Sequence, residues 1–441
     1  MAQQRGPAFA RLANMDFPLP DYATAWTLAF CALLLAVLLT RLWLASRQIR
    51  HVAGHRSAVP LPFASRVSLA SHQKAADYTI ARLRLDLVDK SWNAALLLAW
   101  TLLGGLDWLN QALRAVLGDG LLQQLTLLAG FFTLSALLEL PLAWVRTFRV
   151  EQRHGFNRMS PGLWLADGAK FALVGALIGL PLAALLLWLM ESAGTLWWLW
   201  CWAVWLGFNL LLLLVYPTLI APLFNRFEPL ADASLRERIE ALMARCGFRS
   251  RGLYVMDGSR RSAHANAYFT GFGSARRVVF FDTLLQKLAP GEIDAVLAHE
   301  LGHFRRRHLP RRLALMGLVS LLGFALLGWL SGQLWFYLGL GVRPNLVVPS
   351  SALALLLFAS IAPLAGFFMT PLLNRVSRRH EFEADAYACE HADGSELASA
   401  LVKLYQDNAS TLTPDPTYVR FYYSHPPAAE RLVRLSRARP T

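Results

Sequence analysis

Two histidines and a glutamate, His299, Glu300 and His303, form the pattern with the clearest chemistry in the sequence. They lie in residues 291–307, which follow Pro290, a residue suited to the first position of a helix, where a missing N–H costs little. Residues four apart share one face of a helix, so the two imidazoles can converge on a single ion. Glu300 is adjacent and can reach a water molecule held by that ion. This H-E-x-x-H arrangement is typical of a zinc site in which the glutamate is the general base.

A catalytic zinc ion has three protein ligands, so the two histidines need a partner from elsewhere in the chain. The longer H-E-x-x-H-x-x-G-x-x-H motif is excluded, because Arg306 and Leu309 stand where it requires glycine and histidine. A later charged segment offers Glu381 and Asp385, which share a helix face, whereas Glu383 points elsewhere. We expect Glu381 to be the third ligand and Asp385 to accept the outer N–H of a ligating histidine. An exposed helix with ordinary i,i+4 charge pairs is the alternative.

The composition indicates a membrane protein. Of the 441 residues, 55% are hydrophobic, and several apolar runs are long enough to cross a bilayer core of about 30 Å. The net charge of +14 would suit a nucleic-acid partner, but the arginines cluster beside apolar runs, as the positive-inside rule produces. We therefore expect a lipid bilayer, and no nucleic acid, as a partner. The four cysteines lie far apart and predict neither a disulfide framework nor a thiolate zinc site.

The predicted fold is mainly α-helical: a polytopic membrane protein with seven transmembrane helices and a small α+β soluble catalytic domain that is zincin-like. Residues 1–220 are expected to form a five-span membrane region whose first span is retained as an anchor. Residues 221–310 form the soluble catalytic segment, and 311–373 hold spans six and seven. Residues 374–441 form a polar, mostly helical tail.

Individual elements follow from hydrophobic runs and periodicity. In the soluble segment, we expect an amphipathic helix at 235–246 and short strands at 252–256, 265–272 and 277–281. The seven spans are expected at 22–43, 92–113, 121–145, 163–190, 196–217, 313–341 and 352–373.

Loop charges predict the orientation in the membrane. The loops after spans one, three, five and seven hold nearly all the lysines and arginines, whereas those after spans two, four and six hold almost none. The positive-inside rule then places the N-terminus outside and the catalytic segment and tail together on the cytoplasmic side. The composition, poor in lysine and rich in arginine and alanine, suggests a bacterial inner membrane.

Six separated motifs, taken together, identify a resemblance to a known family. They lie at 150–157, 216–225, 266–272, 299–303, 377–385 and 425–432. Each motif alone is weak, whereas all six in this order are specific. From about residue 151 to its end, the chain resembles the type I CAAX prenyl endopeptidases, which are integral-membrane zinc proteases with seven spans.

The resemblance implies a set of roles at the catalytic centre. His299, His303 and Glu381 would bind one zinc ion per chain, and Glu300 would be the general base. His425 would stabilise the oxyanion of the tetrahedral intermediate, for which a donor beside the metal is needed. A turn residue before two prolines is the alternative for His425.

The resemblance also implies a substrate-binding strand that begins at Asn266. An edge strand can accept a peptide as an additional strand, although an ordinary hairpin is equally compatible with the sequence. Asp385 and Arg431 are expected to support the ligands from behind. The residues of the strand are Asn266, Ala267, Tyr268 and Phe269.

These observations favour a membrane-embedded zinc endopeptidase acting on peptide or protein substrates, with prenylated ones among the candidates. A second hypothesis keeps the chemistry and assigns the chain to quality control of damaged membrane proteins. A third, from another class, is a channel or transporter with a structural metal. A closed site with four protein ligands would support the third hypothesis, and the sequence offers no fourth ligand.

Overall fold

The computed structural model describes residues 19–249, 252–264, 266–270 and 277–437, with the side chains of 19–21 and 268–270 excluded. Long helices dominate the first half of the described chain. They are α2 (Leu19–Gly54), α3 (Leu69–Trp100), α4 (Gly105–Leu117), α5 (Leu121–Val145), α6 (Pro161–Ser192) and α7 (Trp197–Val215).

The second half mixes long helices, short helices and four short strands. The helices are α8 (Ala233–Arg245), α9 (Asp282–Leu285), α10 (Pro290–Arg305), α11 (His308–Leu330), α12 (Leu334–Leu338), α13 (Ser351–Phe367), α14 (Thr370–His391), α15 (Gly394–Asp407), α16 (Pro416–Tyr422) and α17 (Ala428–Arg437). The strands are β1 (Phe227–Pro229), β2 (Leu253–Met256), β3 (Ala267–Thr270) and β4 (Arg277–Phe281).

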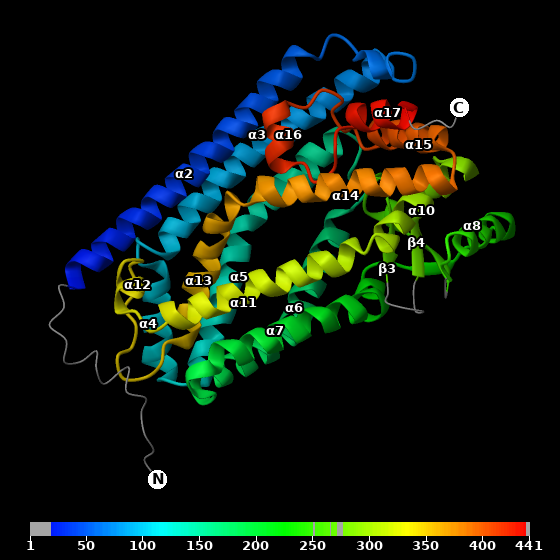
Figure 1. Cartoon of the computed structure of the whole chain (residues 1–441). Helices are drawn as coiled ribbons and strands as arrows, with labels where there is room; N and C mark the ends of the chain where they lie inside the picture. Colours follow the sequence, from blue (N-terminus) through cyan, green and yellow to red (C-terminus); the bar gives the residue numbers. More distant parts are fainter. Residues whose placement is uncertain (1–18, 250–251, 265, 271–276, 438–441) are drawn as a thin grey trace.

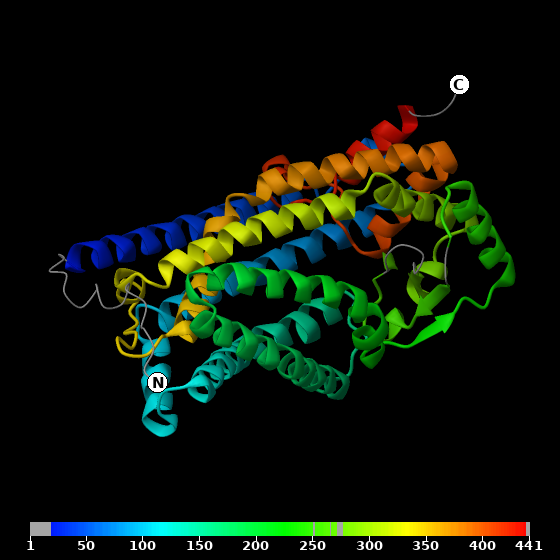
Figure 2. The same ribbon diagram turned by 60° about the horizontal axis from the view of Figure 1, so that its bottom comes forward.

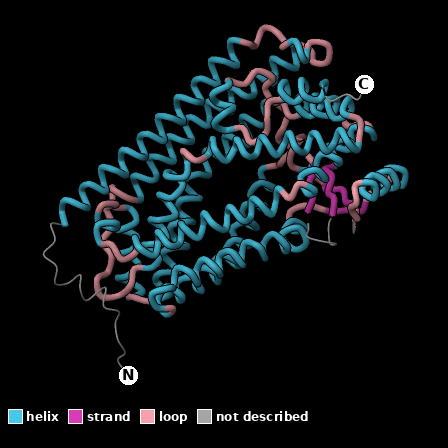
Figure 3. The backbone as a smooth tube through the Cα atoms, in the orientation of Figure 1, coloured by secondary structure: helices cyan, strands magenta, loops and turns pink. Residues whose placement is uncertain are grey.

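The molecule is elongated, and its two ends differ in structure. Long helices run along the molecule, with α4 and α12 at one end (Figure 1). The sheet, α8, α10, α15 and α17 gather at the other end, and a view turned by 60° keeps that grouping (Figure 2). The strands occupy only this end (Figure 3). Residues of the predicted soluble segment and of the C-terminal tail therefore meet at one end of the helical body.

The four strands form one sheet in the order β1-β2-β4-β3. β2 pairs in parallel with β4, while β1 and β3 are antiparallel to their neighbours. In the register between β3 and β4, Ala267 faces Phe280 and Thr270 faces Arg277. β3 is therefore an edge strand of the described sheet, and one side of its backbone faces no other described strand.

Five helical segments are long and apolar enough to span a membrane, and one bent pair passes the same test. The segments are Tyr22–Gly54, Leu121–Glu151, Pro161–Ser192, Gly194–Leu223 and His308–Leu330, and the pair is Ser351–Phe367 with Thr370–His391. The pair bends by 64°, so the predicted seventh span crosses a break between α13 and α14.

The predicted second span, 92–113, is not one helix. α3 ends at Trp100 and α4 begins at Gly105, and between them Gly104 has φ +79°, a conformation that glycine adopts without steric penalty. α3 also carries many charged residues, so it is not apolar enough to be a candidate membrane span. The described chain therefore has five helices, or six with the bent pair, that are long and apolar enough to span a membrane, and seven spans stay a prediction.

The predicted soluble elements lie close to the observed ones. The helix expected at 235–246 is α8, and the strands expected at 252–256 and 277–281 are β2 and β4. β3 covers 267–270 of the strand expected at 265–272, whose residues 265, 271 and 272 lie outside the described residues. β1 was not predicted, because three residues are too few to show a periodic pattern.

One hydrophobic core joins the sheet to the helices that carry the site. It takes a fully buried side chain from each of α8, β4, α10, α14 and α15. These are Ile239, Phe280, Leu297, Ala388 and Leu397. Burying apolar surface stabilises a fold by about 25 cal/mol per Å². This core is therefore the main force that holds α10 against α14.

Candidate active site

α10 presents the two histidines of the H-E-x-x-H motif. Pro290 occupies its first turn, and the Glu292 carboxylate accepts a hydrogen bond from the Ala289 N–H at 2.7 Å, as in a capping box. The same carboxylate accepts from Lys403 Nζ of α15 at 2.7 Å. Burial raises the pKa of Glu292, but Lys403, Ser399 and the Ala289 N–H lower it more, so the carboxylate is ionised at neutral pH. The start of α10 is thereby fixed to α15.

A glycine allows α14 to approach α10 closely. A Cβ atom built on Gly302 would lie 3.0 Å from Ala384 Cα and 3.1 Å from Tyr387 Cβ, both in α14. Such distances are tighter than ordinary van der Waals contact, so a side chain at this position would push the two helices apart. Gly302 lies between the two histidine positions, and this contact brings Glu381 of α14 opposite them.

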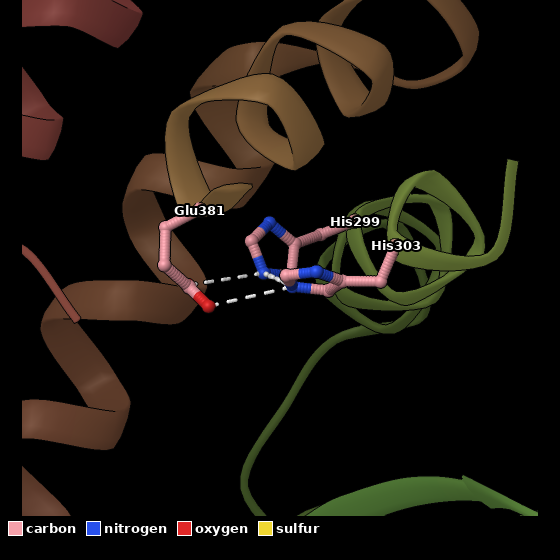
Figure 4. Close-up of side chains that lie close together, drawn as sticks. All are labelled: His299, His303 and Glu381. Atoms are coloured by element: carbon pink, nitrogen blue, oxygen red, sulfur yellow. Dashed lines mark hydrogen bonds and ion pairs between the residues drawn. The ribbon is translucent and has the colours of Figure 1, made fainter. Parts of the chain in front are cut away.

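Three side chains from these two helices converge on one point (Figure 4). His299 Nε2 lies 3.5 Å from Glu381 Oε2, and His303 Nε2 lies 3.4 Å from Glu381 Oε1. The two Nε2 atoms are 3.3 Å apart. One potential ligand atom from each residue lies within 4.8 Å of the others. The predicted ligands are therefore brought together in space.

The chemistry of this cluster fits a metal ion. Glu381 is 5% exposed, and its Oε2 atom accepts no hydrogen bond from the residues that the structure describes. Its neighbours His299 Nε2 and Arg431 Nη1 lie 3.5 and 3.8 Å away. A buried carboxylate oxygen without a hydrogen bond is costly, and a cation between it and the two imidazoles would satisfy it. The donor set of two imidazoles and a carboxylate, with no fourth member among the described residues, is that of a catalytic zinc site with an open position.

Asp385 contacts His299 at the ring nitrogen that faces away from the cluster, and Arg431 pairs with Asp385. His299 Nδ1 lies 2.9 Å from Asp385 Oδ1, and Arg431 Nε donates to Asp385 Oδ2 at 2.9 Å. Burial lowers the pKa of His299, but Asp385 and Glu381 raise it more, to about 9. The pocket therefore favours a positive charge, and a metal ion would displace the proton that otherwise supplies it.

Sequence reasoning missed the partner of His303. His303 Nδ1 lies 2.9 Å from His308 Nδ1, and His308 Nε2 lies 3.1 Å from Glu383 Oε2. If His303 binds an ion through Nε2, its Nδ1–H donates to His308, whose Nε2–H then donates to Glu383. Arg307 has φ +55° and turns the chain so that His308 lies beside His303. A local pattern carries no signal of this turn.

The C-terminal tail brings His425 to the cluster. His425 Nε2 lies 3.3 Å from Glu381 Oε1, and the His425 side chain is 66% exposed. The preceding helix α16 is held by Arg378 of α14, which donates to the Val419 carbonyl at 3.2 Å. Asp415, at the start of α16, pairs with Arg47 of α2 at 3.0 Å. The predicted position of His425 beside the cluster thus depends on α2, α14 and α16 together.

A cleft of about 520 Å³ opens onto His299 and Glu381 of the cluster. Glu300 lines it, as do Asn266 and Ala267 at the start of β3. The backbones of Tyr268 and Phe269 continue β3, but their side chains lie outside the described part of the chain. Apolar and aromatic side chains cover much of the remaining wall. Among them are Leu284, Val296, Leu404, Tyr405, Tyr422 and Tyr423.

The chain is similar to known proteins over most of its length. Residues 48–226 match the family model described as CAAX prenyl protease N-terminal, five membrane helices, and residues 229–439 match the model of peptidase family M48. A CAAX prenyl protease 1 homolog of Arabidopsis thaliana is 37% identical over 318 residues, 71% of this chain and 73% of that protein. CAAX prenyl protease 1 of Saccharomyces cerevisiae is 34% identical over 368 residues, 80% of this chain and 79% of that protein.

A solved structure extends the similarity to the fold. The crystal structure of S. mikatae Ste24p matches with a TM-score of 0.86 at 30% sequence identity, covering 93% of this chain and 98% of that one. The resemblance inferred from the six motifs is thereby confirmed. The chain belongs to the type I CAAX prenyl endopeptidase family within peptidase family M48 and is an integral-membrane, multi-pass metalloendopeptidase.

Proposed function

We propose that the chain is a zinc endopeptidase in which His299, His303 and Glu381 hold one ion. The convergence of these three side chains on one point, with a buried carboxylate oxygen left without a donor, carries the proposal. Zinc at such a site lowers the pKa of a bound water toward ~7 and polarises the scissile carbonyl. Asp385 would fix the tautomer of His299, and His308 that of His303.

Two further side chains take the proposed catalytic roles. Glu300, in the wall of the cleft, accepts a proton from the attacking water and delivers it to the leaving amine. His425 donates a hydrogen bond to the oxygen that becomes negative in the tetrahedral intermediate. Its distance of 3.3 Å from the Glu381 carboxylate supports a position next to the reacting carbonyl.

The substrate is proposed to bind as an extended peptide along β3. The open edge of this strand begins at Asn266 and Ala267, which share the cleft with Glu300. Backbone hydrogen bonds to a sheet edge bind a peptide with little dependence on its sequence. The names of the relatives and the aromatic wall of the cleft, which includes Tyr405 and Tyr423, support a prenylated CAAX-type peptide as the substrate class.

The proposed architecture keeps seven membrane segments and a zincin-like catalytic part. The seventh segment would be α13 with α14, and the second would comprise the end of α3 together with α4. The two matched family regions meet close to residue 220, which supports the proposed division there. The divisions at 310 and 373 stay predictions from the sequence. Loop charge supports a cytoplasmic active site. A bacterial inner membrane stays a prediction from composition, and the relatives named above are eukaryotic.

The decisive experiment is cleavage of a farnesylated CAAX peptide by the detergent-purified chain, with Glu300→Gln beside it. We expect the wild type to cut and the variant to lose at least ~10²-fold in activity while it retains one equivalent of zinc, measured by elemental analysis. The same peptide without its prenyl group tests the substrate class. Full activity of Glu300→Gln would contradict the mechanism.

The other outcomes separate the remaining hypotheses. If the wild type ignores the peptide but cuts an unfolded membrane protein, the quality-control function replaces the CAAX-type one. The third hypothesis, a channel or transporter with a structural metal, is wrong, because the chain belongs to a family of metalloendopeptidases.

A further inference from the structure

A second concave surface, separate from the cleft, is lined by arginine. We call it the arginine groove; it has a volume of about 930 Å³ and lies where the end of α10, the start of α11, α14 and α17 meet. Eight of its eleven lining residues are arginines, and only Glu383 is acidic. So many like charges repel one another unless an anion lies between them. The fold therefore holds a concentrated positive charge that the mechanism proposed above does not use.

Most of this positive charge has no partner within the described chain. Glu383 already accepts hydrogen bonds from Arg379 at 3.0 Å and His308 at 3.1 Å. Arg306, Arg311 and Arg375 are exposed and form no ion pair or side-chain hydrogen bond with the described residues. The groove thus offers guanidinium groups that are free to bind an outside anion. Guanidinium matches the geometry of phosphate oxygens with two parallel hydrogen bonds.

Apolar surface adjoins the groove on two helices. Leu315 and Leu318 of α11 are 43% and 55% exposed, and Leu372 and Val376 of α14 are 55% and 50% exposed. α11 is one of the helices long and apolar enough to cross a bilayer, and it begins one residue after Arg307. The groove therefore lies where membrane-facing apolar surface gives way to charge. An occupant that matches both surfaces carries a phosphate group and acyl chains.

We propose that the arginine groove binds the headgroup of an anionic phospholipid. Its arginines converge on one concave surface, whereas a general attraction to anionic membranes needs only basic residues spread over a loop. The phosphate oxygens accept from the unpaired guanidinium groups, and the acyl chains pack on the apolar faces of α11 and α14. This proposal is independent of the substrate proposed for the cleft.

Lipid retention by the full chain tests the proposal. The detergent-purified protein is titrated with phosphatidylglycerol or phosphatidylcholine, and bound lipid is counted by native mass spectrometry. The groove variant combines Arg306→Gln, Arg311→Gln and Arg375→Gln. The matched control removes the same charge from exposed arginines of two other basic loops, with Arg66→Gln, Arg153→Gln and Arg158→Gln.

We expect the wild type and the control to bind phosphatidylglycerol at least ~10-fold more tightly than phosphatidylcholine, and the groove variant to lose this preference. A double variant, Arg306→Gln with Arg375→Gln, should lose part of it, which keeps the test informative if the triple variant does not fold. Equal binding of the two lipids by the wild type would overturn the proposal, as would equal losses in the groove and control variants.

Two further measurements test other occupants of the arginine groove. Displacement of lipid by 10 mM inorganic phosphate would assign the groove to a soluble anion, and preferential binding of a short RNA would assign it to nucleic acid. Either result would overturn the proposal of a phospholipid.

Discussion

The two histidines of α10 have different partners at the ring nitrogens opposite those proposed to bind the metal. His299 contacts Asp385, which is paired with Arg431, and the side chains of Asp385 and Arg431 are only 6% and 7% exposed. His303 contacts a neutral partner, His308, which leads to Glu383 at 28% side-chain exposure. One histidine is thus supported by a buried ion pair and the other by a chain of hydrogen bonds that ends at the surface.

This difference predicts unequal importance of the two supports. A buried charge pair is costly to break, because the remaining partner is left unpaired in a medium of low polarity. The His303 side chain is 25% exposed, against 9% for His299, so water can replace a partner that His303 loses, although His308 itself is buried. We therefore expect the metal site to depend more on the Asp385 side than on the His308 side.

The largest effect is expected from Asp385→Asn, which keeps the shape and removes the charge. The buried Arg431 then loses its closest counter-ion and keeps only Glu381, 3.8 Å from its Nη1, so the expected loss of stability is about 3–5 kcal/mol. Zinc affinity should fall ~10- to 100-fold, because the outer partner of His299 is weakened. Chelator competition measures the affinity, and thermal unfolding measures the stability. Wild-type zinc affinity and wild-type stability in this variant would contradict the expected difference between the two histidines.

A smaller effect is expected from His308→Gln. His303 loses its imidazole partner but keeps access to water and to the glutamine amide, so we expect zinc affinity to fall by ~10-fold at most. His380→Gln is the matched control, because its ring stacks on His308 at a centroid distance of 4.0 Å and forms no side-chain hydrogen bond with the proposed ligands among the described residues. A loss as large as that of Asp385→Asn would reverse the comparison, and equal losses in His308→Gln and its control would trace the effect to packing.

The smallest effect is expected from Arg379→Gln. Its guanidinium is 81% exposed at the side chain and pairs with Glu383 four residues on. Exposed pairs of this kind contribute about 0.3–0.5 kcal/mol, so zinc affinity should stay within ~2-fold of the wild type. The same chelator competition detects the change. A 10-fold loss of zinc affinity would mean that the exposed Arg379–Glu383 pair controls the position of His303.

Local helical spacing explains what the sequence revealed of the site. His299 and His303 are four apart, as are Glu381 and Asp385, and the structure places each pair on one face of its helix. Glu383 was expected to point elsewhere, and it does point away from the cluster, toward His308. The position of His308 was not predictable, because it depends on the left-handed conformation of Arg307 rather than on a repeating pattern.

The limits of the fold prediction have a similar origin. Hydrophobic runs locate apolar segments, but they do not show where a helix breaks inside one. The predicted second span contains the turn at Gly104, and the predicted seventh contains the 64° bend between α13 and α14. The core helices and two of the strands were predictable, because their patterns are local.

Gly302 makes the proposed metal site sensitive to the distance between α10 and α14. The distance between α10 and α14 at this point is set by the absence of a side chain, since a Cβ there would lie 3.0 Å from Ala384 Cα. Metal–ligand bonds tolerate deviations of only about 0.2 Å. An ion bound by residues of both helices would therefore require a fixed distance between α10 and α14. Any change that separates the helices, however remote from the ligands, will register as a loss of metal affinity.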